Sequence, residues 1–335
     1  MGNRNEDKRI AVLASGGDSP GMNAALRAAV RAALWEHYQV FGIQNGYEGL
    51  LLNDIRELTS RDMGLIINQG GTVLGTARSA QFQTREGLQK AAAILNEHRI
   101  DALCVVGGDG SFRGLMALSE FYKGQVVGIP GTIDNDIPGT EYTIGFDTAV
   151  QTAVEAIDKL RDTALSHGRI FFVEVMGRKS GQIALSVALA SGAEDVLIPE
   201  ERPDIEAVVT RLTKGRDRGK RFAIVVVAEG ATLDAAHPVE SPAFQLAEII
   251  GKQIGQHIRV SVLGHIQRGG RPTSFDRVWG SRTGDAAIRF IKQGLTGVFT
   301  AMRGGHITPA YLFEATQGVR AVEPEMVQLV RKMGS

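Results

Sequence analysis

Short apolar runs alternate along the chain with longer stretches in which apolar residues recur at helical spacing. Residues 10–14 precede a predicted helix at 23–36, and residues 102–106 precede another at 111–122. This alternation is typical of a parallel sheet. Most of the runs are apolar at every position, which predicts strands buried between helix layers. Further strands are predicted at 126–129, 170–175, 196–198, 222–228 and 258–263. The expected fold is therefore α/β, with mainly parallel sheets flanked by helices.

The length of 335 residues predicts two lobes with a ligand cleft between them. The longest helical pattern covers residues 146–167 and is expected to begin the second lobe. Since no Pro- or Ser-rich linker follows the first lobe, we expect the chain to cross between Rossmann-like lobes more than once. The predicted lobes are 1–145 plus about 267–317, and 146–266 plus about 318–335.

Charge and cysteine content narrow the class of protein. Lys plus Arg and Asp plus Glu each total 37, so no net charge attracts nucleic acid or an anionic membrane. The single cysteine, Cys104, lies in an apolar run and is interpreted as a buried core thiol. The polar N-terminus does not resemble a signal peptide, and no apolar run approaches the roughly 20 residues of a membrane span. These features favour a cytoplasmic protein.

Two glycine-rich loops follow predicted strands, at the sheet edge where α/β proteins bind ligands. The first, residues 15–21, reads SGGDSPG and opens into a helix, which exposes backbone N–H groups to an anion. An ordinary strand-to-helix turn has the same composition. The second, residues 106–111, reads VGGDGS and places Asp109 where phosphates and Mg²⁺ would sit. Kinases of NAD and of diacylglycerol share this GGDG run, as would a turn with a solvated Asp.

The stretch PGTIDND at residues 130–136 places two carboxylates after a predicted strand. Phosphoryl transfer needs a positioned acceptor hydroxyl, a carboxylate to accept its proton, a metal ion and positive charge. Asp134 is the predicted base, and Asp136 its companion on the metal side. An acidic turn without chemistry is the alternative reading.

Several arginines near the ends of later predicted strands suit a phosphorylated substrate, because a guanidinium grips phosphate with two parallel hydrogen bonds. His265 adds a further donor, and Glu229 can accept from sugar hydroxyls. Taken individually, each arginine is more typical of a surface charge. The arginines are Arg169, Arg178, Arg259 and Arg268.

Six motifs in this order, GGDSPGMNA, GGDGS, PGTIDND, MGR, AEG and GHIQRGG, resemble those of the phosphofructokinase family, specifically its bacterial ATP-dependent type. The likeness spans roughly residues 9–300. It implies a glycolytic kinase that converts fructose 6-phosphate to fructose 1,6-bisphosphate, with ATP bound by the first lobe and the sugar phosphate by the second.

The resemblance also implies a role for each site residue. Asp134 would be the catalytic base, assisted by Arg78, Thr132 and Arg178, and Asp109 would bind Mg²⁺ together with Asp136. The ATP site would comprise Gly17, Arg78, Ser79, Gly108, Asp109, Gly110 and Ser111. The fructose 6-phosphate site would comprise Thr132, Asp134, Arg169, Met176, Gly177, Arg178, Glu229, Arg259, His265 and Arg268. Arg169 and Arg259 would come from a neighbouring subunit, which implies a homotetramer.

Two positions distinguish phosphoryl donors within the family. Pyrophosphate-dependent members typically carry Asp where Gly110 stands and Lys where Gly131 stands. A side chain at Gly110 would fill space that a nucleotide needs, and a lysine at Gly131 would add charge beside the transferred phosphate. ATP is therefore the predicted donor, with pyrophosphate as the alternative.

Bacterial relatives have an allosteric site for ADP and phosphoenolpyruvate between subunits. The matching basic residues are Arg27, Arg31, Arg161, Arg218, Lys220 and Arg221. Ser60, Leu65 and Phe222 depart from the pattern, standing where well-known members carry Arg, Asp and His. A solvated helix face is the other interpretation of Arg27 and Arg31, which are spaced four apart.

Two other classes of protein share some of these motifs. A nucleotide-sensing protein on the same scaffold would bind ATP without turnover, but this sequence lacks neither the predicted base nor the phosphate clamp. A lipid or NAD kinase would account for GGDG alone, leaving His265, Arg268 and PGTIDND unexplained.

Overall fold

The computed structural model describes residues 8–234, 236–237 and 239–334. The polar segment 1–7, part of the N-terminus judged unlike a signal peptide, lies outside the described residues. The chain divides into two compact units. Unit 1 comprises residues 1–133, 137–147 and 268–318, and unit 2 comprises 134–136, 148–267 and 319–335. Residues 134–136 thus group with unit 2, whereas the sequence suggested the first lobe.

Unit 1 is built on a seven-stranded sheet in the order β11-β10-β5-β4-β1-β2-β3. Its inner pairs are parallel, while the outermost pairs, β10 with β11 and β2 with β3, are antiparallel. The strands are β1 (Arg9–Ala14), β2 (Gln39–Ile43), β3 (Ile55–Glu57), β4 (Ala102–Gly107), β5 (Gln125–Pro130), β10 (Val298–Arg303) and β11 (His306–Tyr311).

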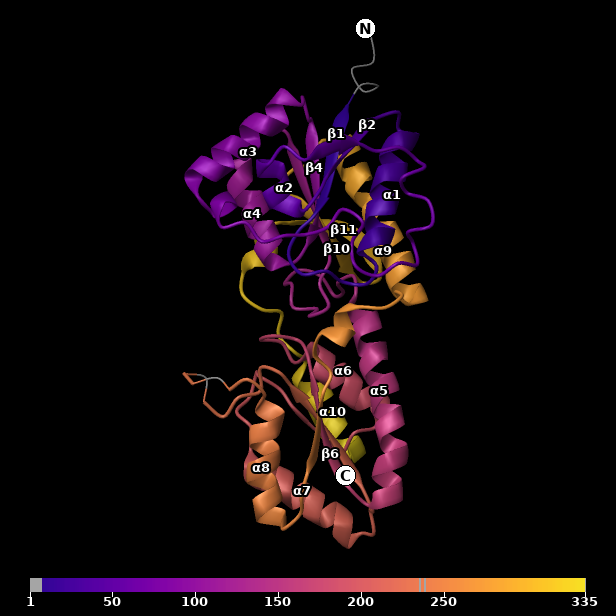
Figure 1. Ribbon diagram of the computed structural model, residues 1–335, viewed down its shortest axis with the longest axis vertical. Coiled ribbons are helices and arrows are strands. Elements are labelled where there is room, and N and C mark those ends of the chain that lie inside the picture. Colours follow the sequence, from indigo (N-terminus) through magenta and orange to yellow (C-terminus); the bar gives the residue numbers. More distant parts are fainter. Residues whose placement is uncertain (1–7, 235, 238, 335) are drawn as a thin grey trace. The chain divides into compact units, whose positions relative to one another are not determined.

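Helices cover both faces of this sheet (Figure 1). Side chains alternate along each strand, so Ile10 and Val12 enter one core while Ala11 and Leu13 enter the other. The first core contains α1 (Met22–Trp35) and α9 (Ser274–Lys292), and the second contains α2 (Gly46–Leu51), α3 (Arg85–Glu97) and α4 (Asp109–Ser119). Two short 3₁₀ turns, η1 (Gln81–Gln83) and η3 (Glu314–Thr316), complete the unit.

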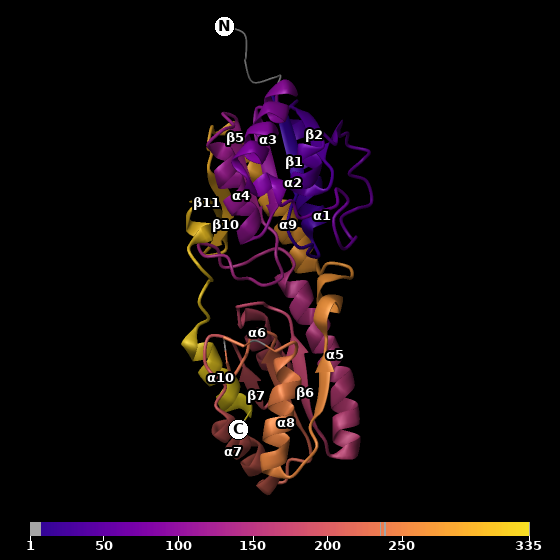
Figure 2. The same ribbon diagram turned by 60° about the vertical axis from the view of Figure 1, so that its left-hand side comes forward.

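Unit 2 contains a four-stranded, fully parallel sheet in the order β7-β8-β6-β9. The helix α5 (Phe146–His167), which has the predicted bounds, runs alongside this sheet (Figure 2). The strands are β6 (Ile170–Val175), β7 (Asp195–Leu197), β8 (Ala223–Ala228) and β9 (Arg259–Val262). The other helical segments are α6 (Gln182–Ser191), α7 (Ile205–Asp217), α8 (Pro242–Ile254), η2 (Gly264–Arg268) and α10 (Pro324–Gly334).

The predicted fold class is confirmed: helices flank sheets that are mainly parallel. The general expectation that the predicted strands are buried fails at β9, which forms a sheet edge with Arg259 and Val262 exposed. Within the described residues, no helix is both long and apolar enough to cross a membrane.

Candidate active site

The first glycine loop links β1 to α1 at the carboxyl end of the unit 1 sheet. The backbone N of Ser15 donates to Val106 O at 2.9 Å, which ties the loop to the end of β4. The hydroxyl of Thr76 donates to Gly16 O at 2.7 Å. The loop is therefore fixed between two strand ends, at the start of a helix whose first N–H groups lack intrahelical partners.

The second glycine loop leaves one buried hydroxyl for a ligand. Ser111 is 4 % exposed, and within the described residues its Oγ has no hydrogen-bond partner. A Cβ added to Gly16 would lie 3.1 Å from this Oγ, and one added to Gly107 only 2.5 Å. Ser111 Oγ thus lies between the two glycine loops. Because a buried donor without a partner is costly, this atom points to a polar ligand.

Asp109 lies in the first turn of α4, because the helix begins two residues earlier than predicted. Its carboxylate is 29 % exposed and forms an ion pair with Arg113 at 3.2 Å. Among the described residues, no three His, Cys, Asp or Glu side chains form a metal-binding group. Magnesium commonly takes one or two carboxylates, with phosphate and water oxygens completing its shell. Asp109 fits that mode of binding.

The segment carrying Arg78 is held by Asn23, a residue that the sequence analysis did not single out. Asn23 is 1 % exposed, and its Nδ2 donates to Gln69 O at 3.1 Å and Gly70 O at 3.2 Å. Its Oδ1 accepts from Val73 N at 2.8 Å. Arg78 itself is exposed. A polar residue on the buried face of the predicted first helix was the available signal.

Arg268 lies against the first glycine loop within unit 1. A Cβ added to Gly17 would lie 2.6 Å from Arg268 Nη1, and this nitrogen donates to Asp18 O at 3.2 Å. Arg268 was predicted to bind the sugar phosphate, but within unit 1 it contacts the loop predicted to bind ATP.

The PGTIDND stretch contributes residues to both units. Thr132, in unit 1, borders the second glycine loop, since a Cβ added to Gly108 would lie 3.7 Å from Thr132 Cβ. Asp134 belongs to unit 2, is 2 % exposed and lies 3.9 Å from Arg178 Nε through its Oδ2. A buried carboxylate beside a guanidinium is thus present where the base was predicted.

The MGR turn after β6 brings together several predicted substrate residues in unit 2. Glu229 Oε1 accepts from Gly177 N at 3.2 Å and from Arg178 N at 2.7 Å. The side chain of Arg178 is 57 % exposed, and Met176 is 7 % exposed. His265 lies in η2 and is exposed. Glu229 therefore also holds the turn, a role that the sequence did not suggest.

Arg169 and Arg259 do not join this turn within the chain. Arg169 directly precedes β6, and Arg259 opens β9, where it pairs with Phe171. Met176 to Arg178 follow the other end of β6. Six residues of strand separate the two ends by roughly 20 Å.

The predicted effector residues in unit 1 lie on α1. Arg31 Nη2 is 3.5 Å from Ser60 O, and burial together with the charge of Arg31 lowers the pKa of Arg27. Leu65, one of the departures from the family pattern, is 88 % exposed and has a left-handed backbone with φ 56°.

Three of the predicted effector residues in unit 2, Arg218, Lys220 and Arg221, line a pocket of roughly 440 Å³, as does Phe222, one of the departures from the family pattern. Lys220 Nζ donates to Gly334 O at 2.7 Å. Arg161 donates to the carbonyl of Ser191, and its guanidinium carbon lies 5.9 Å from the centre of the Phe222 ring. Part of this basic group is therefore engaged by the chain itself.

Comparison with known proteins agrees with these features. The family model described as phosphofructokinase matches residues 9–291. An ATP-dependent 6-phosphofructokinase of Brevibacillus brevis is 48 % identical over 327 residues, covering 97 % of this chain and 99 % of the relative. The enzyme of the same name from Bacillus subtilis is 46 % identical over 326 residues, with the same coverage of both chains.

Solved structures support the same relationship. The chain is similar to phosphofructokinase from Saccharomyces cerevisiae, with a TM-score of 0.84 and 34 % identity over 97 % of this chain. It spans 46 % of that longer yeast chain. A pyrophosphate-dependent phosphofructokinase from Nitrosospira multiformis shares the fold, with a TM-score of 0.84 at 22 % identity. On the family match and the identity over nearly its full length, this chain belongs to the phosphofructokinase family.

Proposed function

We propose that the chain is an ATP-dependent 6-phosphofructokinase, which transfers the γ-phosphoryl group of ATP to the 1-hydroxyl of fructose 6-phosphate. The observation that carries this proposal is near full-length similarity to relatives of that name, at 46–48 % identity over 97 % of the chain. Such enzymes act in glycolysis, which is a cytoplasmic pathway.

ATP would bind to unit 1. The two glycine loops supply backbone N–H groups, and the buried Ser111 Oγ supplies a hydroxyl for phosphate oxygens. Asp109 would hold Mg²⁺ jointly with those oxygens, and the ion would neutralise charge that develops on the transferred phosphoryl group. Asp136 would supply a second carboxylate for the ion. Arg78 and Ser79 would complete this half of the site.

Fructose 6-phosphate would bind to unit 2, with Asp134 accepting the proton of the attacking hydroxyl. Arg178, whose Nε lies 3.9 Å from Asp134 Oδ2, would supply positive charge beside this base. Thr132, Met176, Gly177, Glu229, His265 and Arg268 would position the sugar phosphate. Arg169 and Arg259 would serve a neighbouring copy, since they lie at the far end of β6 and β9; this arrangement supports a homotetramer.

The space at two glycines supports ATP over pyrophosphate as donor. A Cβ added to Gly110 meets no atom within 4 Å, which leaves room for a nucleotide. A Cβ added to Gly131 would lie 3.0 Å from both Met22 Cε and Val106 Cγ1, so a lysine there requires neighbouring side chains to move.

By the family likeness, the basic residues around the pocket in unit 2 and the pair Arg27 and Arg31 in unit 1 would each contribute to effector sites between subunits, for a phosphorylated metabolite. The three departures at Ser60, Leu65 and Phe222 would weaken its response to ADP or phosphoenolpyruvate. Activity measured with and without each compound tests this part of the proposal.

Asp134→Asn tests the central role. The variant should lose at least three orders of magnitude in kcat while KM for fructose 6-phosphate changes little, because only proton removal is lost. Asp158→Asn, an exposed change on α5, is the matched control. Formation of ADP with fructose 6-phosphate is the assay, with pyrophosphate as a second donor. ATP binding without turnover would instead indicate a nucleotide-sensing protein, and phosphorylation of NAD or a lipid alone would indicate another kinase.

A further inference from the structure

The turn that follows β6 has a backbone conformation that requires support. Gly177 has φ 140° and Arg178 has φ 54°, both in the left-handed region. For a residue with a side chain, this region costs roughly 1–2 kcal/mol. Such conformations persist where surrounding groups hold them, and they concentrate at functional sites.

Two side chains that follow neighbouring strands accept hydrogen bonds from three consecutive amides of this turn. Gln267 Oε1 accepts from Met176 N at 2.8 Å, while Glu229 Oε1 accepts from the next two amides, those of Gly177 and Arg178. Glu229 follows β8, and Gln267 lies in η2 after β9. Because β8 and β9 flank β6 in the sheet, the turn is held from both sides.

Gln267 is placed so that both ends of its amide are used. It is 0 % exposed, and its Nε2 donates to Ala149 O at 3.2 Å, in the first turn of α5. Reversing the amide would set like groups against each other at both contacts, so the orientation is determined. A buried amide satisfied in this way links the turn, η2 and α5 through one side chain.

We propose that Gln267 is a positioning residue for substrate binding. It fixes the amide of Met176, and with Glu229 it sets the left-handed turn that directs Arg178 toward Asp134 and the phosphate of the substrate. Gln267 does not itself touch the substrate. The predicted effect on substrate binding rests on the proposed function, whereas the predicted hold on the Met176 amide does not.

The kinetic test replaces Gln267 with methionine, which has similar length and no hydrogen-bonding amide. Gln267→Met should raise KM for fructose 6-phosphate at least tenfold and leave KM for ATP within twofold. In an Arg178→Ala background, the same change should add less than twofold, because the guanidinium that it positions is already absent. Gln151→Met is the matched control, since Gln151 is an exposed α5 residue whose Nε2 donates to Glu155 Oε1 at 2.9 Å. An equal loss in both backgrounds, or an unchanged KM, overturns the proposal.

Hydrogen exchange provides a readout independent of activity. In Gln267→Met, the amide of Met176 should exchange at least tenfold faster than in the wild type, while amides of β7 keep their rates. If this variant does not fold, Glu229→Gln and Glu229→Ala address the same turn, since only Gln retains an acceptor oxygen. Exchange at residues 177–178 should then be faster in the Ala variant.

Unchanged exchange at Met176, or equal rates in the two Glu229 variants, refutes the positioning role even if the enzyme phosphorylates fructose 6-phosphate. A protein that shows the exchange effects but no such activity would refute the proposed function instead.

Discussion

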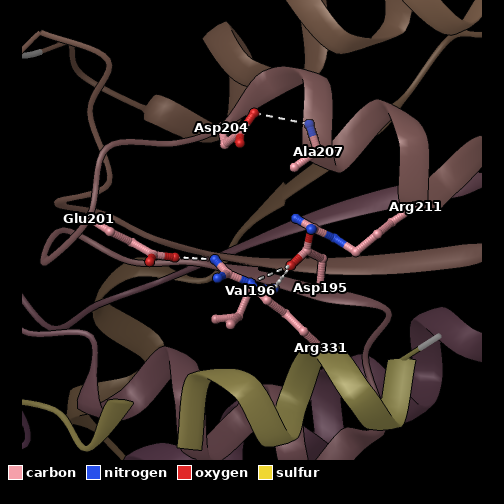
Figure 3. A network of polar contacts seen from close by, with 7 residues as sticks. All are labelled: Asp195, Val196, Glu201, Asp204, Ala207, Arg211 and Arg331. Carbon is pink, nitrogen blue, oxygen red and sulfur yellow. Dashed lines mark hydrogen bonds and ion pairs between the residues drawn. The ribbon is translucent and has the colours of Figure 1, made fainter. Parts of the chain in front are cut away.

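Replacing Arg211 should destabilise the protein far more than replacing Arg331, although both arginines approach the same carboxylate. Asp195 opens β7 and is 1 % exposed. Figure 3 shows its carboxylate beside both Arg211 and Arg331. Arg211 contacts its Oδ2 through Nη2 at 2.5 Å and through Nε at 2.7 Å, whereas Arg331 Nε lies 3.8 Å from Oδ1. Asp204 caps the start of α7 by accepting from Ala207 N at 3.0 Å, which fixes the helix that carries Arg211.

The expected magnitudes follow from burial and geometry. Burial raises the pKa of Asp195, and Arg211 is the strongest opposing influence. Among the residues that the structure describes, Arg211→Met leaves the buried carboxylate with the amide of Val196 at 2.9 Å and the distant Arg331. Breaking a buried pair in this way costs about 3–5 kcal/mol. Arg331→Met removes a longer contact and a pair with the exposed Glu201, so it should cost about 1 kcal/mol or less.

Urea unfolding followed by far-ultraviolet circular dichroism at pH 7 measures both losses. The double variant Asp195→Asn/Arg211→Met should regain at least half of the stability that Arg211→Met loses, because no buried charge is then left without its partner. Equal losses for the two single arginine variants would refute the reasoning. A double variant no more stable than Arg211→Met would refute it as well.

Two further predictions concern packing and pH. Gly131→Lys should lower the melting temperature by several degrees and lower kcat/KM for ATP at least tenfold. Gly110→Asp should lower only kcat/KM, since its Cβ enters open space. Thermal melts and kinetics of both variants check this, and a Gly131→Lys protein with wild-type values contradicts it. Burial raises the pKa of Glu174 in the folded protein. The stability that Glu174 contributes is therefore fully present below the unfolded pKa near 4.5 and is lost as pH rises through the folded pKa. Glu174→Gln should therefore gain melting temperature relative to the wild type between pH 4 and pH 7, and a constant difference across that range would exclude this linkage.

The central strands could be predicted from the sequence because a strand buried on both faces is a continuous apolar run. β1, β4, β5, β6 and β8 are apolar at nearly every position, and α5 has an uninterrupted helical period. The antiparallel outer strands of unit 1 were missed. β10 joins the sheet beside β5, from which it is separated by more than 160 residues, and its pairing depends on contacts that no local pattern records.

The candidate site was predictable to the extent that loop composition encodes it. Glycines beside carboxylates after buried strands identified both loops and Asp134. The contacts that orient these groups were not predictable, because they join residues distant in sequence. Arg268 reaches Asp18 across 250 residues, and Gln267 reaches Met176 across 91. Their partners become evident only when the strands are aligned.

The parallel sheet of unit 2 limits what one copy of the chain can do. All four strands run in the same direction, so residues that precede the strands gather at the amino ends of the sheet and residues that follow them gather at the carboxyl ends. Arg169 and Arg259 lie at the amino ends of the strands, and Arg178 lies at the carboxyl ends. An arginine side chain extends about 7 Å, which is much less than the roughly 20 Å length of β6. If all three arginines bind one sugar phosphate, as the family likeness implies, two of them must come from another copy. Substrate affinity would then depend on assembly, while ATP binding to unit 1 would not.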